Sequence, residues 1–130
     1  MLVGEGPGEN EDLQGEPFVG RSGQLMDKML EYAGLSRKKN IYIANMVKCR
    51  PPQNRDPAPG EIEACIGWLR NQVAILRPAI IVCIGRVAAV SLPHQHDLGP
   101  RSPHAEHHVV PCGAKAAVFT LEHLLPQLVQ

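Results

Sequence analysis

A continuous apolar run lies in the second half of this sequence: Ala79-Ile80-Ile81-Val82-Cys83-Ile84-Gly85. Such a run is typical of a strand that is buried on both faces of a parallel sheet. Residues 40–47 are β-branched and aromatic, which predicts a second strand. Residues 1–3 are apolar and run directly into a glycine loop, which indicates a third strand that ends there.

Helical periodicity separates these strands. Apolar residues recur at helical spacing from Ser22 to Leu35, where Gly34 is a stop signal, and again from Glu61 to Leu76. Strands that alternate with helices predict an α/β fold with three layers, α/β/α, around a central and mainly parallel sheet.

The composition limits the class of protein. Thirteen Lys and Arg residues balance thirteen Asp and Glu residues, so any affinity for a polyanion must come from local patches of charge. No apolar run reaches the ~20 residues that a membrane span requires. A chain of 130 residues suits one domain, residues 1–130, and we expect a soluble, monomeric, cytoplasmic protein. Its four cysteines have irregular spacing, which favours reduced or metal-binding thiols over disulfides.

The composition changes near Ser91. All six histidines lie at or after His94, and proline and histidine are frequent in residues 93–111. We therefore separate residues 1–90 from a divergent tail, residues 91–130. Within this tail, residues 116–129 predict one helix, interrupted by Pro126.

The glycine loop, Gly4-Glu5-Gly6-Pro7-Gly8, is the first candidate functional motif. Its glycines permit close approach of the backbone, so amide groups can face an anion or the polar edge of a base. Taken alone, the loop also fits an ordinary turn between a strand and a helix.

Longer stretches resemble a known family. Residues 4–12 and 15–25 resemble the first signature of the iron-sulfur class of uracil-DNA glycosylases, and residues 45–52 resemble the second. The likeness continues from Cys65 to Ala89 and covers about two thirds of the chain. It implies a DNA repair enzyme with a uracil-DNA glycosylase-like fold. Such an enzyme flips uracil out of single- or double-stranded DNA and hydrolyses its N-glycosidic bond, without a lysine nucleophile.

The residues of these motifs suit that chemistry. Cleavage develops positive charge on the sugar and negative charge on the departing base, so the site needs a carboxylate and anion-stabilising donors. Glu5, with the amides around Gly4 and Gly6, can supply both. The resemblance gives the glutamate the role of orienting water and stabilising the sugar cation. A solvated acidic turn is the alternative.

Phe18 and Asn45 are the candidate base-binding residues. The resemblance implies that Phe18 stacks on uracil, whereas a lone aromatic residue is otherwise more often in the core. Asn45 lies at the end of a predicted strand, where ligand sites of α/β sheets form. Its carboxamide can accept from uracil N3-H and donate to O4, a pattern that cytosine does not match. An asparagine that satisfies a turn is the alternative.

Cys49 and Cys65 are the candidate metal ligands. The resemblance implies a 4Fe-4S cluster with four cysteine ligands, of which this chain matches only these two. Cys83 fits the core, and Cys112 lies in the tail. Between the two candidate ligands runs a proline-rich basic loop, residues 48–59, which together with residues 37–39 offers positive charge to DNA phosphates.

The tail does not match the family. The resemblance implies a histidine followed by proline and small residues, which stabilises the leaving uracil, but Pro103-His104-Ala105 has the reverse order. We interpret the tail as a shifted reading frame after about Ala89, which translation of the other frames tests. Two further hypotheses stay open: a catalytically degenerate protein that still binds uracil or DNA, and a small α/β module that binds nucleotide phosphates.

Overall fold

The computed structural model describes residues 1–94, 109–112 and 114–117. Its main sheet has three strands, β1 (Leu2–Gly4), β2 (Ile43–Asn45) and β3 (Val82–Cys83), in the order β2-β1-β3. Both pairings with β1 are parallel, and Leu2 lies opposite Ile43 on one side and Val82 on the other. The predicted parallel sheet is confirmed, with β1 in the middle.

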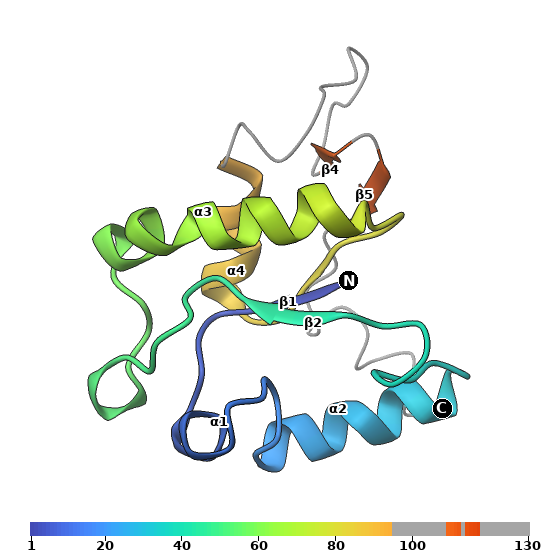
Figure 1. Ribbon diagram of the computed structural model, residues 1–130, viewed down its shortest axis with the longest axis horizontal. Coiled ribbons are helices and arrows are strands. Elements are labelled where there is room, and N and C mark those ends of the chain that lie inside the picture. The colour runs from blue at the N-terminus through green and yellow to red at the C-terminus, as the bar shows by residue number, and fades with distance from the viewer. Residues whose placement is uncertain (95–108, 113, 118–130) are drawn as a thin grey trace.

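Helices cover both faces of this sheet. Helices α1 (Glu9–Gln14) and α2 (Arg21–Tyr32) lie on one side, and α3 (Pro59–Leu76) and α4 (Arg86–Ser91) lie on the other (Figure 1). The predicted three-layer α/β/α architecture is therefore present in the described residues.

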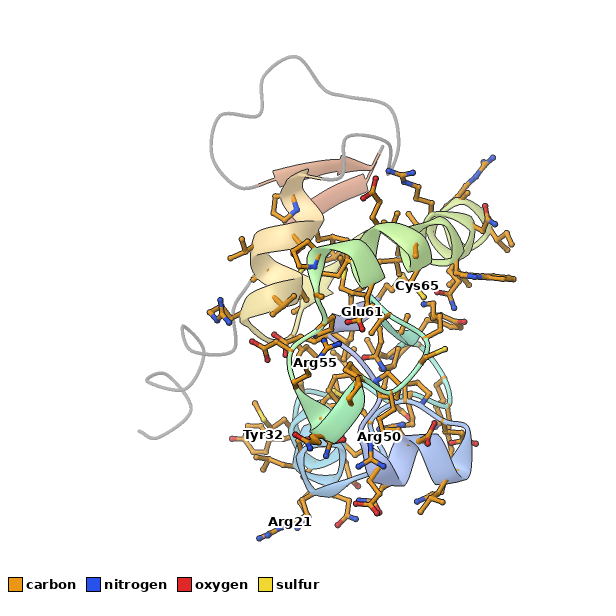
Figure 2. All side chains as sticks on the ribbon, turned by 90° about the vertical axis from the view of Figure 1, so that its left-hand side faces the viewer. Arg21, Tyr32, Arg50, Arg55, Glu61 and Cys65 are labelled. Carbon is orange, nitrogen blue, oxygen red and sulfur yellow. The ribbon has the colours of Figure 1, made fainter. Side chains whose placement is uncertain are left out.

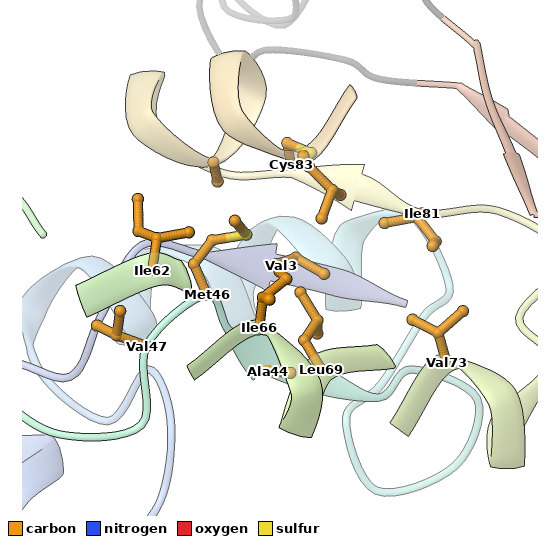
Figure 3. Packing of buried hydrophobic residues seen from close by; sticks show 12 residues of the cluster. Val3, Ala44, Met46, Val47, Ile62, Ile66, Leu69, Val73, Ile81 and Cys83 are labelled. Carbon is orange, nitrogen blue, oxygen red and sulfur yellow. The ribbon is translucent and has the colours of Figure 1, made fainter. Parts of the chain in front are cut away.

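Alternation along the strands divides the core into two clusters. The larger cluster joins strand residues such as Val3 and Cys83 to the apolar face of α3, including Leu69, as Figure 3 shows. The smaller cluster joins the opposite strand face, Leu2 and Ile43, to Met26 of α2. Successive strand residues thus point to opposite helical layers, which is the side-chain period that a strand imposes.

The two long helices begin and end close to their predicted limits. Helix α3 begins two residues before Glu61, because Pro59 suits the first helical turn and the Glu61 carboxylate accepts a hydrogen bond from the Ala58 amide at 2.8 Å. It ends at Leu76, and the next residue, Arg77, adopts the left-handed conformation before Pro78. Helix α2 ends at Tyr32 rather than Leu35, and Gly34 follows with a φ of 72°.

Several predictions need correction. The strands are shorter than residues 40–47 and 79–85, because β2 pairs with the short β1 along three residues and β3 pairs with it along two. Helices α1 and α4 were not predicted, since each has only six residues. The predicted tail helix is wrong at Ala116 and Ala117, which pair with β-branched residues of β4 (Val109–Cys112) as part of β5 (Ala114–Ala117). The rest of that helix lies outside the described residues.

Within the described ranges, none of the helices has the length and apolar character needed to cross a membrane.

Candidate functional site

The candidate site lies where the three parallel strands end. Glu5 follows β1, Asn45 is the last residue of β2, and Gly85 lies two residues after the end of β3. Because parallel strands place their carboxyl ends at the same edge, these residues meet although they lie far apart in the sequence. This edge is where open α/β sheets bind ligands.

The Glu5 carboxylate is held between β1 and α4. Its Oε1 accepts a hydrogen bond of 2.7 Å from the Val87 amide in the first turn of α4. Gly85 gives this carboxylate room, because a Cβ at that position would lie 2.6 Å from Glu5 Cδ. Within the described residues, only Oε1 accepts a hydrogen bond, so one carboxylate oxygen of Glu5 is anchored and the other is available to a ligand.

Phe18 and Asn45 converge on Gly4. A Cβ at Gly4 would lie 2.4 Å from Phe18 Cζ and 2.5 Å from Asn45 Oδ1, so only glycine leaves room for both side chains. Gly6 has a different neighbour, because its Cβ would lie 2.8 Å from a methyl group of Val47. The structure therefore brings together the predicted Gly4, Phe18 and Asn45, while Gly6 allows the loop after β2 to approach.

Asn45 carries an unsatisfied buried acceptor. The residue is only 6% exposed, and its Oδ1 has no hydrogen-bond partner within the described part of the chain. Such a group costs about 1–3 kcal/mol when it stays unpaired. A ligand that donates a hydrogen bond to Oδ1 would remove this cost.

Lys48 links the backbone of Asn45 to helix α3. Its Nζ donates to the Asn45 backbone carbonyl at 2.8 Å and to Gln72 Oε1 of α3 at 2.7 Å. Burial of the ammonium group lowers the pKa of Lys48. Two of the three N–H groups of this ammonium therefore bond to protein oxygens.

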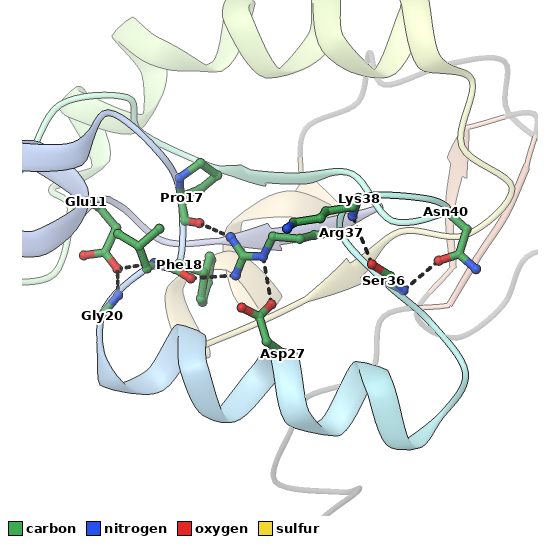
Figure 4. Close-up of polar contacts among 10 residues, drawn as sticks. Glu11, Pro17, Phe18, Gly20, Asp27, Ser36, Arg37, Lys38 and Asn40 are labelled. Atoms are coloured by element: carbon green, nitrogen blue, oxygen red, sulfur yellow. Dashed lines mark hydrogen bonds and ion pairs between the residues drawn. The ribbon is translucent and has the colours of Figure 1, made fainter.

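The aromatic residue of the site lies on a tightly held segment, residues 15–20, which we call the Phe18 loop. Phe18 has a φ of 54°, in the left-handed region. Arg37 donates to the carbonyls of Pro17 and Phe18, and Glu11 accepts from the amides of Val19 and Gly20, as Figure 4 shows.

Glu11 and Arg37 were missed as site residues by sequence reasoning. Glu11 had a signal, because it lies three residues after Gly8, the N-cap residue of α1, and its carboxylate accepts from the Gly8 amide at 3.1 Å. Arg37 had no local signal, because its partners are 19 and 20 residues away.

A cavity of about 280 Å³ borders Asn45 on the side of β2. Its lining includes Pro17, Lys48 and Gln72, but neither Glu5 nor Phe18. The cavity and the cluster of candidate residues therefore share Asn45 but do not coincide. We define the site by the groups that converge on Gly4, because these carry the chemistry.

The two candidate metal ligands, Cys49 and Cys65, both lie beside Lys48. Cys49 is exposed, whereas Cys65 on α3 is partly buried and accepts a hydrogen bond of 3.4 Å from the Lys48 amide. Cys83 is fully buried, and burial raises the pKa of its thiol to about 11, which agrees with the predicted core role. The described residues contain no group of three or more potential metal ligands. They therefore do not provide a complete ligand set for a four-iron cluster, and the Cys112 side chain lies outside them.

The arginines of the basic loop form ion pairs at the surface. Arg55 bonds to both carboxylate oxygens of Glu61, at 2.7 and 2.9 Å, and the two side chains lie together in Figure 2. This pairing lowers the pKa of Glu61 to about 2. Arg50 lies 3.7 Å from Glu9, and Arg86 of α4 lies 2.7 Å from Asp56 of the loop.

Residues 37–39 do not extend this basic surface as predicted. They lie in the turn before β2, at the opposite edge of the sheet from Asn45. The Arg37 guanidinium points back to the Phe18 loop.

Comparisons with known proteins point to one family. A family profile described as "Uracil DNA glycosylase superfamily" matches residues 1–130. The chain is 51% identical over 98 residues to the type-4 uracil-DNA glycosylase of Archaeoglobus fulgidus, covering 75% of this chain and 49% of the relative. The type-4 enzyme of Thermotoga maritima is 50% identical over 88 residues, covering 68% of this chain and 45% of that protein.

A type-5 uracil-DNA glycosylase of Pyrobaculum aerophilum is more distant, at 34% identity over 102 residues, which cover 68% of this chain and 45% of the relative. The chain thus spans about half the length of the curated relatives that it matches.

Proposed function

The chain belongs to the uracil DNA glycosylase superfamily, and from this premise we propose that it removes uracil from DNA by hydrolysing the N-glycosidic bond. The observation that carries the proposal is the meeting of Phe18 and Asn45 at Gly4, while the following residue, Glu5, holds its carboxylate at Gly85 and the Val87 amide. An aromatic face, a buried acceptor and a carboxylate are groups that suit the capture of a base and the cleavage of its bond to the sugar. The reaction leaves an abasic site and begins base excision repair.

Phe18 and Asn45 hold the extruded base. Uracil must leave the base stack before a protein can reach its glycosidic bond, and a flipped base is held by stacking and by bonds to its pairing edge. The Phe18 ring stacks on uracil, while Asn45 Oδ1 accepts from N3-H and the Asn45 amide donates to O4. Cytosine presents an acceptor at N3 and a donor at its exocyclic amine, so both contacts with Asn45 are mismatched. Support comes from the buried, unpaired Oδ1.

Glu5 acts on the sugar and on water. As the bond breaks, positive charge develops on the deoxyribose, and a carboxylate nearby stabilises it. Val87 fixes one carboxylate oxygen of Glu5, which supports a role for the other in orienting the attacking water. The reaction is hydrolytic and monofunctional.

An assay on a uracil-containing oligonucleotide tests this function. The chain is incubated with single-stranded and double-stranded substrates, and abasic sites are then cleaved with alkali. We expect cleavage only after alkali, and its loss in Glu5→Gln. The matched control is Glu31→Gln, which removes an exposed carboxylate from α2. Strand scission without alkali would contradict the monofunctional reaction, and equal activity of Glu5→Gln would reject the role of Glu5.

Cys49 and Cys65 are proposed as two of the four ligands of a 4Fe-4S cluster. The described residues supply no third ligand beside them, so this chain is expected to bind a cluster poorly, because two irons would lack protein ligands. Anaerobic reconstitution with iron and sulfide analysis checks this. A stoichiometric four-iron cluster would contradict the expectation and would make Cys112 the first replacement ligand to test.

Two alternatives predict different competitors. A protein that only binds uracil would release a uracil-containing oligonucleotide when free uracil is added, and it would produce no abasic sites. A phosphate-binding module would bind nucleoside phosphates with similar affinity whatever their base. The glycine loop is less suited to phosphate, because the Gly8 amide already donates to Glu11 and acidic residues surround it.

A further inference from the structure

We propose that Arg37 and Glu11 are positioning residues that clamp the Phe18 loop and so fix the surface on which the extruded base stacks. The inference rests on the proposed function, because it assigns Phe18 to the base. Neither side chain is among the groups that converge on Gly4. Both therefore act through the backbone on either side of Phe18.

The conformation of Phe18 needs such a restraint. Its φ of 54° lies in a region that residues with a side chain rarely adopt. The loop also packs tightly on α2, because a Cβ at Gly23 would lie 1.9 Å from the Phe18 carbonyl oxygen. The aromatic ring reaches Gly4 only while the backbone keeps this unusual shape.

Arg37 holds the carbonyl side of the loop. Its Nη1 donates to Pro17 at 2.8 Å and its Nη2 donates to Phe18 at 2.6 Å. Its Nε donates to Asp27 of α2 at 2.8 Å, which orients the guanidinium plane (Figure 4). The Arg37 side chain is only 20% exposed, so solvent screens these bonds less than those of a surface arginine. A planar fork of donors suits two adjacent carbonyls, whereas a lysine has no such fixed geometry.

Glu11 holds the amide side of the loop. Its Oε1 accepts from Val19 at 2.9 Å and from Gly20 at 2.8 Å, while its Oε2 accepts from Gly8 in the glycine loop. Burial of this carboxyl raises its pKa, but the amide bonds outweigh burial and the pKa lies below its ordinary value. The carboxylate therefore ties the Phe18 loop to the loop that carries Glu5. Four successive residues, 17–20, are each bonded to Arg37 or Glu11.

A double-mutant cycle tests whether Arg37 acts through Phe18. The probes are two oligonucleotides that differ at one position, with a non-cleavable 2′-fluoro deoxyuridine in one and a tetrahydrofuran abasic analogue in the other. We expect Arg37→Met to weaken binding of the uracil probe roughly tenfold, within the range for the loss of one stacked base. Binding of the abasic probe should stay unchanged. In a Phe18→Ala background, Arg37→Met should have no further effect on the uracil probe, because residues that act together are not additive.

Milder substitutions separate a local effect on the Phe18 loop from misfolding of the whole chain. Arg37→Lys keeps the charge and should lose part of the uracil affinity, and Asp27→Asn should lose less. Glu11→Gln should resemble Arg37→Met, because a neutral amide is a weaker acceptor for two N–H groups. Lys28→Met is the matched control, since it removes an exposed cation next to Asp27 on the same helix.

The position of the Phe18 ring is measured separately by NMR in the free protein. Contacts of the ring with Gly4 and with the Asn45 side chain should be present in the wild-type chain and in Lys28→Met, and lost in Arg37→Met. If the wild-type chain binds both probes equally, the proposed function fails, but loss of the ring contacts in Arg37→Met still supports the clamp. Retained ring contacts, or an equal effect of Arg37→Met with and without Phe18, would overturn it.

Discussion

Two loops border the candidate site, and they are held in different ways. The Phe18 loop is fixed by charged side chains that bond to its backbone, through Arg37 on one side and Glu11 on the other. The basic loop, residues 48–59, is tied by pairs between side chains at the surface, such as Arg55 with Glu61 and Arg86 with Asp56. Both rely on charge, but to different extents. In the Phe18 loop four successive residues bond through their backbone to Arg37 or Glu11, whereas in the basic loop charged side chains also bond to the Asp56 carbonyl and the Ala58 amide, within a set of exposed ion pairs.

The two kinds of contact give the two loops different properties: the backbone of the Phe18 loop is fixed, whereas the side chains of the basic loop can change partners. Bonds from a half-buried charge to backbone groups set the path of the chain and are weakly screened, whereas exposed ion pairs are screened by salt and contribute little to stability. The Phe18 loop is suited to present one rigid ring to a base. The basic loop is suited to exchange its carboxylate partners for DNA phosphates.

Gly23→Ala should break the first region most severely. A Cβ at Gly23 would lie 1.9 Å from the carbonyl oxygen of Phe18, a backbone atom that cannot move alone. We expect a loss of about 3 kcal/mol in the free energy of unfolding, at the upper end for overpacking. Urea unfolding of the chain measures this change.

Gly67→Ala is the matched control in the middle of α3, where a Cβ meets no atom within 4 Å. It should stabilise the chain by about 0.5–1 kcal/mol, because alanine is the better helix former. Equal stability of Gly23→Ala and wild type would contradict the tight packing of the Phe18 loop.

Asn45→Asp tests the base-reading group that faces this loop. An aspartate no longer offers the donor and acceptor pair that matches uracil, so the preference for uracil over cytosine should fall roughly tenfold or more. Excision rates from oligonucleotides with one uracil or one cytosine measure it, and Asn71→Asp on the exposed side of α3 is the control. Unchanged selectivity in an active variant would reject the role of Asn45.

Glu11→Gln should change how the stability of the chain depends on pH. The pKa of Glu11 in the folded chain lies below its ordinary value of 4.5, because bonds from backbone amides outweigh the effect of burial. A depressed pKa stabilises the fold above about pH 4.5, and this contribution is lost as pH falls through the folded-state pKa. Glu11→Gln should therefore be less stable than wild type at neutral pH, and the gap should narrow in acid. Urea unfolding at several pH values measures the gap, which would stay constant if Glu11 had no such role.

Arg55→Gln should have the smallest effect, confined to the second region. Its partner Glu61 is exposed, so thermal stability should not change measurably. Affinity for DNA should fall uniformly across sequences, and the dependence of log affinity on log salt should become shallower by about one unit. Lys39→Gln, at the opposite edge of the sheet, is the control with one charge removed. An identical salt dependence in Arg55→Gln and wild type would exclude a phosphate contact at Arg55.

Local patterns in the sequence were sufficient for the architecture. The apolar run at residues 79–85 and the helical spacing of residues 61–76 predicted the buried strand and helix that form the larger core. The motifs also contained Gly4, Phe18 and Asn45, which the fold brings together. These features are readable because periodicity and turn residues act over a few positions.

Only the tertiary structure decided how those residues are held. The length of β2 follows from β1, which offers three residues for pairing. Nothing in the sequence of residues 40–47 indicates that only three of them pair. Arg37 belongs by sequence to a basic turn, yet it bonds to carbonyls 19 and 20 residues away. Lys48, which is partly buried, bonds to Asn45 and Gln72. The sequence determined which chemical groups are present and on which elements they lie. Their partners depend on which segments the packed sheet and helices bring within hydrogen-bond reach, because a polar group that is buried must find its partner wherever the fold supplies one.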